Sequence, residues 1–174
     1  MHSTHFLSVV HSHWTKIWRA ALAFFVLTSV HAQEPSVACK LLQESEIESA
    51  LGGKATKFSG GIVGNADMCN GQVGSLKVLI RIAKRRGDSG GVKERQGIES
   101  LRAKGWRIEV KAEGDLTCST AIPPASMAQA GVNTTCSILR AGKVVAVEVG
   151  APSQKEMASM DAVRKLAQKA VSRL

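Results

Sequence analysis

Hydrophobic and polar side chains alternate most regularly in two segments of the chain. In residues 76–82 the apolar positions are separated by Lys77 and Arg81, although Leu79 makes one face less clean. In residues 106–111 apolar side chains again alternate with charged ones. A period of two residues is typical of a strand with one buried face. The pattern therefore predicts strands over 76–82 and 106–111.

Shorter patterns predict three more strands in the second half of the chain. A strand over 116–121 ends at the two prolines that follow Ile122. A loop or short helical turn then leads into a hairpin with arms over 134–140 and 143–149. Ala141-Gly142 stands between these arms and supplies the turn. Glu113-Gly114-Asp115 forms the turn between the strand over 106–111 and the strand over 116–121.

Helical spacing marks three further segments. A short helix over 44–51 begins with acidic residues, which suit a helix start, and a second is expected over about 92–104. The last begins at Ser153, which forms a capping-box pattern with Glu156, and runs to Leu174. The side chains expected to face inward from the second helix are Val92, Ile98 and Leu101.

Glycine is frequent in residues 54–74 and predicts a weak hairpin pinned by Cys69, in place of a stiff strand pair. The expected order is thus helix, weak hairpin, strand, helix, four strands and helix. Strands joined mostly by tight turns favour an α+β fold, with an antiparallel sheet and helices packed on it.

The amino-terminal segment has the pattern of an export signal. Residues 1–32 contain Lys16 and Arg19 but no acidic residue, and an uncharged run follows from Ala20 to Val30. We expect cleavage after Ala32, which leaves residues 33–174 as a single domain in the periplasm or outside the cell. The uncharged run is far shorter than the roughly 20 residues that span a bilayer, so no transmembrane span is expected.

Four cysteines, all in residues 33–174, predict two disulfides in an exported protein. Three pairings are possible, and we favour Cys39–Cys69 with Cys118–Cys136 because each joins neighbouring elements. Each bond contributes about 3 kcal/mol in the chain-entropy description. Zinc is the competing reading, but residues 33–174 contain neither a Cys-x-x-Cys motif nor a histidine. No metal site and no cofactor are therefore expected.

Composition excludes several classes of function for residues 33–174. All five histidines lie in residues 1–32, and Phe58 and Trp106 are the only aromatic side chains beyond them. Catalysis by Ser-His-Asp or Cys-His groups needs a histidine base. Single-stranded nucleic acid binding usually needs several stacking aromatics. Neither function is expected, and nucleic acid is not an expected partner.

The string Gly87-Asp88-Ser89-Gly90-Gly91 is similar to the sequence around the nucleophile of trypsin-like serine proteases. With no histidine to accept the Ser89 proton, Lys93 is the only base nearby, and it stands among charged residues and glycines. We expect a turn that leads into a helix and no enzymatic activity. A minimal Ser/Lys hydrolase at Ser89 is the alternative.

Positive charge is concentrated in one part of the chain. Residues 81–111 contain ten basic and four acidic side chains, and Lys84, Arg85 and Arg86 are consecutive. Gly90 and Gly91 follow at the expected helix start, where free backbone N–H groups favour an anion. Solvated loop charges are the simpler reading. The functional reading is a binding segment for an acidic lipid, an envelope polymer or an acidic protein.

Several features together resemble small secreted domains of unknown function found in bacterial lipoproteins. These features are Cys39-Lys40-Leu41-Leu42, the following Glu46–Gly52 segment, a cysteine in a glycine-rich hairpin, a strand pair with cysteines and the closing helix around Ala162–Ala167. The chain also resembles, more distantly, the PsbP-like sandwich. Unlike the lipoproteins, it lacks a cysteine directly after the apolar run. The resemblance implies a non-enzymatic domain that faces the cell envelope.

The sequence therefore favours an exported, non-enzymatic binding domain that contacts an acidic partner through its basic segment. A proteinaceous inhibitor or an accessory subunit is a further alternative, because a small disulfide-bonded scaffold suits those roles as well.

Overall fold

The computed structural model describes residues 36–85, 87 and 89–174, so the expected signal peptide lies outside the described residues. Within the described residues, seven strands form one sheet in the order β1-β2-β3-β7-β6-β5-β4, and all neighbours are antiparallel. The strands are β1 (Ser59–Val63), β2 (Ala66–Val73), β3 (Leu76–Lys84), β4 (Arg107–Glu113), β5 (Leu116–Ile122), β6 (Val132–Arg140) and β7 (Lys143–Ala151). The predicted α+β fold is confirmed.

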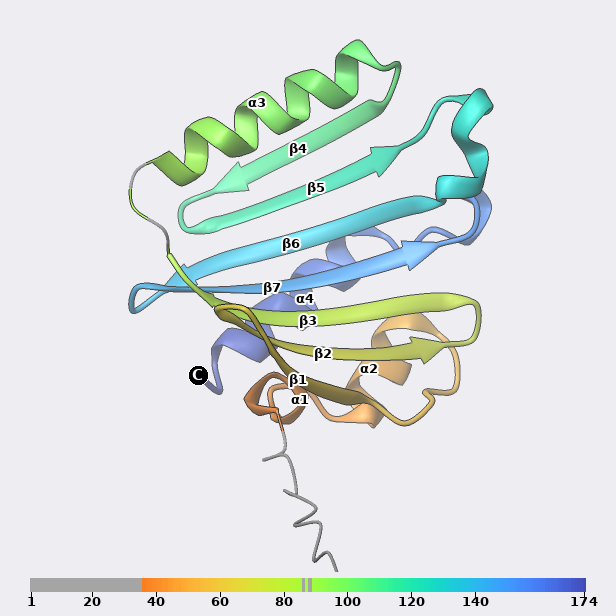
Figure 1. Cartoon of the computed structure of the whole chain (residues 1–174). Helices are drawn as coiled ribbons and strands as arrows, with labels where there is room; N and C mark the ends of the chain where they lie inside the picture. Colours follow the sequence, from red (N-terminus) through yellow and green to blue (C-terminus); the bar gives the residue numbers. More distant parts are fainter. Residues whose placement is uncertain (1–35, 86, 88) are drawn as a thin grey trace, which may run out of the picture. The chain divides into compact units, whose positions relative to one another are not determined.

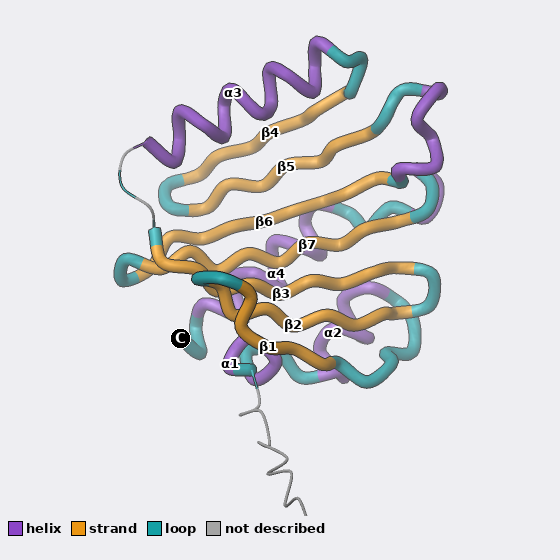
Figure 2. Tube along the Cα trace, in the orientation of Figure 1, coloured by secondary structure: helices purple, strands orange, loops and turns teal. Residues whose placement is uncertain are grey.

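Helices pack on one face of this sheet, which we call the helical face, and leave much of the other, the open face, uncovered. The α-helices are α1 (Val37–Lys40), α2 (Glu44–Leu51), α3 (Ser89–Ala103) and α4 (Met160–Val171), and the 3-10 helices are η1 (Ala125–Ala130) and η2 (Gln154–Glu156). Figures 1 and 2 show α1, α2 and α4 behind the sheet, whereas α3 runs beside the edge strand β4.

The hydrophobic core lies between α4 and the central strands. Ile80 of β3, Val147 of β7 and Cys136 of β6 are successive cross-strand partners, and each is at most 1% exposed. From α4, Val163 and Ala167 are fully buried against this layer. The strict alternation of buried and partly exposed positions in β6 explains why the sequence pattern predicted this strand well.

Both predicted disulfides are present, one between a helix and the sheet and one within the sheet. Cys39–Cys69 ties the short helix α1 to β2, and Cys118–Cys136 joins directly opposite residues of β5 and β6. All four cysteines are thus paired in the described chain. The first bond fixes the amino-terminal helices to the sheet. A small domain buries a limited core, so such a bond adds to its stability.

The glycine-rich segment forms a more regular structure than a weak hairpin. β2 pairs with β3 through eight residues and with β1 through five. A Cβ atom at Gly60 would lie 2.9 Å from Cys39 Sγ, and one at Gly71 would lie 2.6 Å from the Phe58 ring. The glycines are therefore required by close contacts with the disulfide and the aromatic ring, and do not indicate a poorly ordered strand pair.

The strand predicted over 106–111 is present as β4, but its apolar side chains lie on the open face. Lys111 faces Cys118 and Glu109 faces Thr120, so the charged residues of β4 lie on the helical face. Val110, which faces Ser119, is 39% exposed. The pairing register with β5 decides the face, and a sequence pattern alone does not contain that register.

The last helix begins later than expected. Its N-cap is Ser159, whose hydroxyl accepts a hydrogen bond from the Ala162 N–H at 3.2 Å. Ser153 and Glu156 do interact, through a 2.9 Å hydrogen bond between their side chains, but they frame the short helix η2. Ala158 is buried in between and its carbonyl accepts a hydrogen bond from Thr134, so tertiary contacts hold this connection in an extended form.

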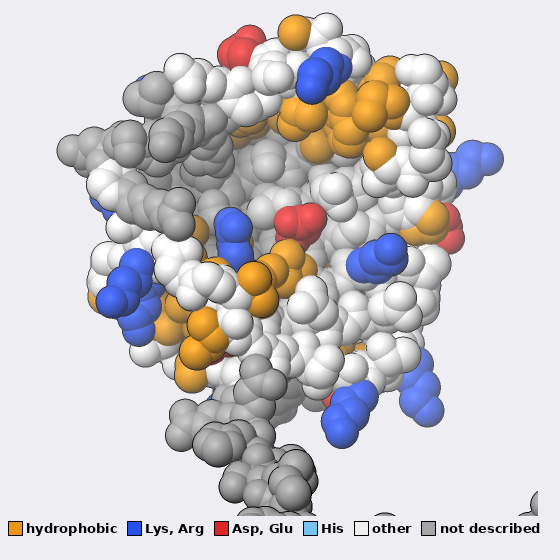
Figure 3. Space-filling model, in the orientation of Figure 1, with side chains coloured by type: hydrophobic (Ala, Val, Ile, Leu, Met, Phe, Trp, Pro, Cys, Tyr) orange, Lys and Arg blue, Asp and Glu red, His pale blue; other side chains and the backbone are white. Residues whose placement is uncertain are grey.

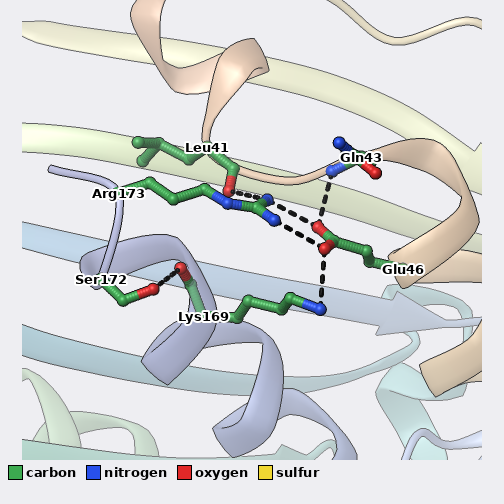
Figure 4. A network of polar contacts seen from close by, with 6 residues as sticks. All are labelled: Leu41, Gln43, Glu46, Lys169, Ser172 and Arg173. Carbon is green, nitrogen blue, oxygen red and sulfur yellow. Dashed lines mark hydrogen bonds and ion pairs between the residues drawn. The ribbon is translucent and has the colours of Figure 1, made fainter.

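A compact ion cluster, which we call the Glu46 clamp, holds α2 against the end of α4 (Figure 4). Arg173 donates two 2.6 Å hydrogen bonds to the Glu46 carboxylate, and Lys169 lies 2.7 Å from it. The Gln43 backbone N–H donates a further bond at 2.9 Å. The hydrogen bonds from Arg173, above all, hold the pKa of Glu46 far below its usual range. The carboxylate also raises the pKa of Arg173.

Candidate anion-binding site

The predicted basic segment lies at the end of β3. Lys84 is the last residue of that strand and Arg85 follows it, with both residues exposed. The Arg85 backbone N–H donates a 2.9 Å hydrogen bond to the Gly142 carbonyl, so the segment is attached to the β6–β7 turn. Arg86 lies outside the described residues. Gly90 and Gly91 are the second and third residues of α3, which begins at Ser89 and not at about residue 92 as the sequence predicted.

Strand pairing adds two basic residues that the sequence prediction missed. Lys84 is the cross-strand partner of Lys143 in β7, and Lys143 is in turn the partner of Arg140 in β6. We call these three exposed residues, Lys84, Lys143 and Arg140, the basic row. Among the described residues, no acidic side chain forms an ion pair with any of the three.

A tight turn fixes two members of the basic row next to each other. Ala141 and Gly142 connect β6 to β7, and both have positive φ, at 48° and 73°. Two successive positive φ values are typical of a type I′ hairpin turn, which matches the twist of the flanking strands. Arg140 and Lys143 therefore leave the turn as directly opposed residues, with Cβ atoms about 5 Å apart.

Like charges in such positions act against the fold. Directly opposed side chains of the same charge destabilise a strand pair, although water reduces the cost to about 1 kcal/mol or less per contact. An anion bound between the three cations would remove this repulsion. The arrangement is therefore better suited to binding a negatively charged group than to stabilising the sheet.

The open face has a hollow of about 840 Å³, which Lys84 lines but the other two members of the basic row, Lys143 and Arg140, do not. Its basic lining residues are Arg81, Lys84 and Arg85, and Asp115 is the acidic one. Small side chains line the rest of its floor, among them Thr117, Thr135, Ser137 and Ala146. Figure 3 shows this side of the molecule, with basic and acidic side chains on the described part of the open face. The hollow thus has an excess of positive charge and room for polar groups.

The alternative catalytic site is only partly described. Ser89 is the first residue of α3, but the side chains of Ser89 and Lys93 lie outside the described part, so the dyad remains untested. In residues 36–85, 87 and 89–174, no three His, Cys, Asp or Glu side chains are grouped in a way that could hold a metal ion. No helix in the described part is both long and apolar enough to cross a bilayer.

Comparison with models of known protein families and with curated proteins gives no match. Among solved structures, the chain is similar to the extracellular domain of PknH from Mycobacterium tuberculosis, with a TM-score of 0.53 and 9% sequence identity. The alignment covers 81% of this chain and 97% of that one. At such identity the likeness shows a shared fold alone. The resemblance to lipoprotein domains and to the PsbP-like sandwich stays a prediction, because no match bears on it.

The two missed residues left a partial signal in the sequence. Arg140 and Lys143 flank a two-residue turn, which identifies them as neighbours across the hairpin. Nothing local indicates that β7 also pairs with β3, since about 60 residues lie between these strands. The basic row therefore could not be assembled from the sequence alone.

Proposed function

We propose that the protein is an exported, non-enzymatic domain that binds an acidic partner through the basic row and Arg85. The observation that carries this proposal is the cross-strand row of three exposed like charges, Lys84, Lys143 and Arg140, with no acidic partner in the described residues. Export is supported by the signal pattern in residues 1–32 and by the two disulfides, which form in oxidising compartments.

A soluble polyanion tests the proposed site directly. Polyphosphate should bind the purified exported protein, and the affinity should fall steeply with salt because exposed charges are screened over about 8 Å at physiological ionic strength. The variant K84S/R140S/K143S should lose most of this binding. The control variant K54S/K77S/K155S removes the same charge from exposed lysines elsewhere and should retain most of it. If the two variants lose the same amount of polyphosphate binding, the basic row contributes only through the net charge of the protein.

Export and oxidation have a separate test. Mass spectrometry of the exported protein should show an amino terminus at Gln33 and a mass four hydrogens below that of the reduced chain. Free thiols, or a lipid attached to Cys39, would contradict this processing.

The non-enzymatic reading is tested at Ser89. With no histidine in residues 33–174, we expect that a general serine-reactive probe does not label the protein and that Ser89→Ala changes no measurable activity. Labelling that disappears in the Ser89→Ala variant, with the fold intact, would favour the hydrolase instead.

A further inference from the structure

Two exposed hydrophobic side chains lie at the same end of the sheet as the basic row. Ile62 is 75% exposed and Val63 is 65% exposed, and no other large hydrophobic side chain in the described residues is as exposed. Both belong to the edge strand β1, directly before the turn into β2. Both side chains project at one strand end, where they can contact another phase or molecule.

Val63 is also the first member of a continuous apolar row on the open face. Successive cross-strand partners in this row, which we call the apolar row, are Val63, Ala66, Ala83, Val144 and Leu139. All five side chains are partly or fully exposed. The row crosses five of the seven strands, and the other rows of the open face contain polar or charged residues such as Arg81 and Glu148.

The apolar row and the basic row are neighbours along the strands. Ala83 precedes Lys84 in β3, Lys143 precedes Val144 in β7, and Leu139 precedes Arg140 in β6. One residue advances a strand by about 3.3 Å, and neighbouring strands lie about 4.8 Å apart. Successive side chains of a strand point to opposite faces, so the apolar row lies on the open face and the basic row on the helical face, and the two rows come together only where the strands end. Ile62, whose cross-strand row continues through Asp67 and Ile82, lies on the same face as the basic row, whereas Val63 lies on the open face. β1 is about 10 Å from β3, so both side chains are near the cations at this end of the sheet. Figure 3 shows basic and hydrophobic side chains together at this end of the sheet.

We propose that this end of the sheet docks on the surface of an anionic lipid bilayer. The proposal rests on the proposed function, because the basic row supplies the attraction in both. Cations attract anionic head groups, and apolar side chains enter the boundary between head groups and acyl chains. Ile62 and Val63 at the β1–β2 turn act as the anchor, and Lys84, Lys143 and Arg140 contact the lipid phosphates.

The apolar side chains favour a membrane over the other acidic partners. A soluble polymer of phosphates or carboxylates neutralises the cations but leaves Ile62 and Val63 in contact with water. A bilayer surface offers both an anionic layer and an apolar layer within a short depth, which matches the cations and the two exposed apolar side chains at this end of the sheet. An acidic protein with an apolar patch is the competing occupant, and the test below separates it.

Vesicle flotation tests the proposal with two pairs of variants. The probe is a set of unilamellar vesicles made of phosphatidylcholine with or without phosphatidylglycerol. The exported protein should float with the anionic vesicles and not with the neutral ones. Each cation near a charged bilayer contributes roughly fivefold to affinity, so K84S/R140S/K143S should bind roughly 100-fold more weakly.

The apolar anchor has its own matched pair. I62S/V63S should weaken binding to the anionic vesicles by roughly tenfold or more, because it removes the side chains that enter the bilayer. The control V110S/M127S removes two other exposed apolar side chains, which are 39% and 38% exposed, and should bind as the wild type does. Circular dichroism checks the fold, and the single Ile62→Ser variant replaces the double variant if that one unfolds.

Polyphosphate separates a failure of this proposal from a failure of the proposed function. I62S/V63S should bind polyphosphate as well as the wild type does. Polyphosphate binding without vesicle binding, or vesicle binding that does not change in I62S/V63S, overturns the membrane proposal and leaves the proposed function standing. Binding to neither probe overturns both. An acidic protein that the wild type binds and I62S/V63S does not, in the absence of vesicle binding, assigns the surface to a protein partner.

Discussion

Two clusters of charged side chains in this protein differ in how their charges are paired. In the Glu46 clamp, Arg173 and Lys169 surround one carboxylate that is only 13% exposed, and every charge has a partner of opposite sign. In the basic row, Lys84, Lys143 and Arg140 are exposed and adjacent, and no acidic side chain of the described chain pairs with them. The first arrangement is suited to holding α2 and α4 together. The second is suited to attracting a partner.

The two clusters affect different free energies: the Glu46 clamp contributes to the stability of the fold, and the basic row contributes to binding. A paired and partly buried carboxylate gains from its hydrogen bonds, and loses most if one partner is removed. Exposed like charges cost little because water and salt screen them, so the fold can keep them for another purpose. The comparison predicts opposite signs for substitutions in the two clusters.

The largest expected effect belongs to Glu46. Glu46→Gln should lower the free energy of unfolding by about 1 to 2 kcal/mol, because Arg173 and Lys169 keep their charges but lose the carboxylate. Denaturant unfolding measures this change. Glu44→Gln is the control: it removes an acidic residue from the same first turn of α2, where the helix dipole acts similarly, and should change stability by less than about 0.5 kcal/mol.

The clamp should also produce an acid dependence. Because the pKa of Glu46 is lowered in the folded state, its contribution is complete above the unfolded pKa of about 4.3 and is lost as pH falls through the folded pKa. The stability difference between wild type and Glu46→Gln should therefore shrink between about pH 5 and pH 2. A difference that stays constant over this range would show that the carboxylate charge is not what stabilises the clamp.

A single charge reversal should turn the basic row into a paired cluster. Lys143→Glu places a carboxylate between Lys84 and Arg140, its two cross-strand partners. Opposite charges in facing positions should raise the unfolding free energy by about 0.5 to 1 kcal/mol, while polyphosphate binding is lost. Thermal unfolding and a binding titration on the same sample measure both effects. Lys77→Glu, on the same strand as Lys84 but far from the row, should leave binding nearly unchanged.

The smallest expected effect is the stability change in K84S/R140S/K143S. Removal of three adjacent like charges should leave the unfolding free energy unchanged or raise it by a few tenths of a kcal/mol, about 0.5 at most. Urea unfolding at low and high salt measures it, and the gain should diminish as salt rises. Clear destabilisation would mean that these side chains hold the sheet together and would remove the contrast with the Glu46 clamp.

Most of the fold followed from local sequence patterns. The strand over 76–82, the hairpin arms at 134–140 and 143–149 and both disulfides are present as predicted. The short helix α1 was not predicted, because its first N–H groups are capped from a distance: Asp67 accepts hydrogen bonds from the backbone of Val37 at 2.8 Å and of Ala38 at 3.3 Å. A four-residue helix of this kind has no sequence pattern of its own.

The sequence predicted only part of the candidate site. Lys84 and Arg85 were identified from the basic run, since local charge density can be read directly from a sequence. The β3–β7 and β6–β7 pairings place Lys143 and Arg140 beside Lys84. The position of β1 at the sheet edge exposes Ile62 and Val63 at the same end of the sheet. Pairing between strands distant in sequence depends on the whole fold, and one sequence without its partners carries little information about it.

The sequence by itself determined most of the strands and helices and the α+β class, and it favoured one of three cysteine pairings, because periodicity, turn residues and cysteine spacing act over short distances along the chain. Only the tertiary structure decided which face of β4 is buried, why Gly60 and Gly71 must be glycine and which cations lie side by side. The physical reason is the register of the sheet. One residue of shift moves every side chain to the other face, and that register is set by the packing of the complete sheet against α4.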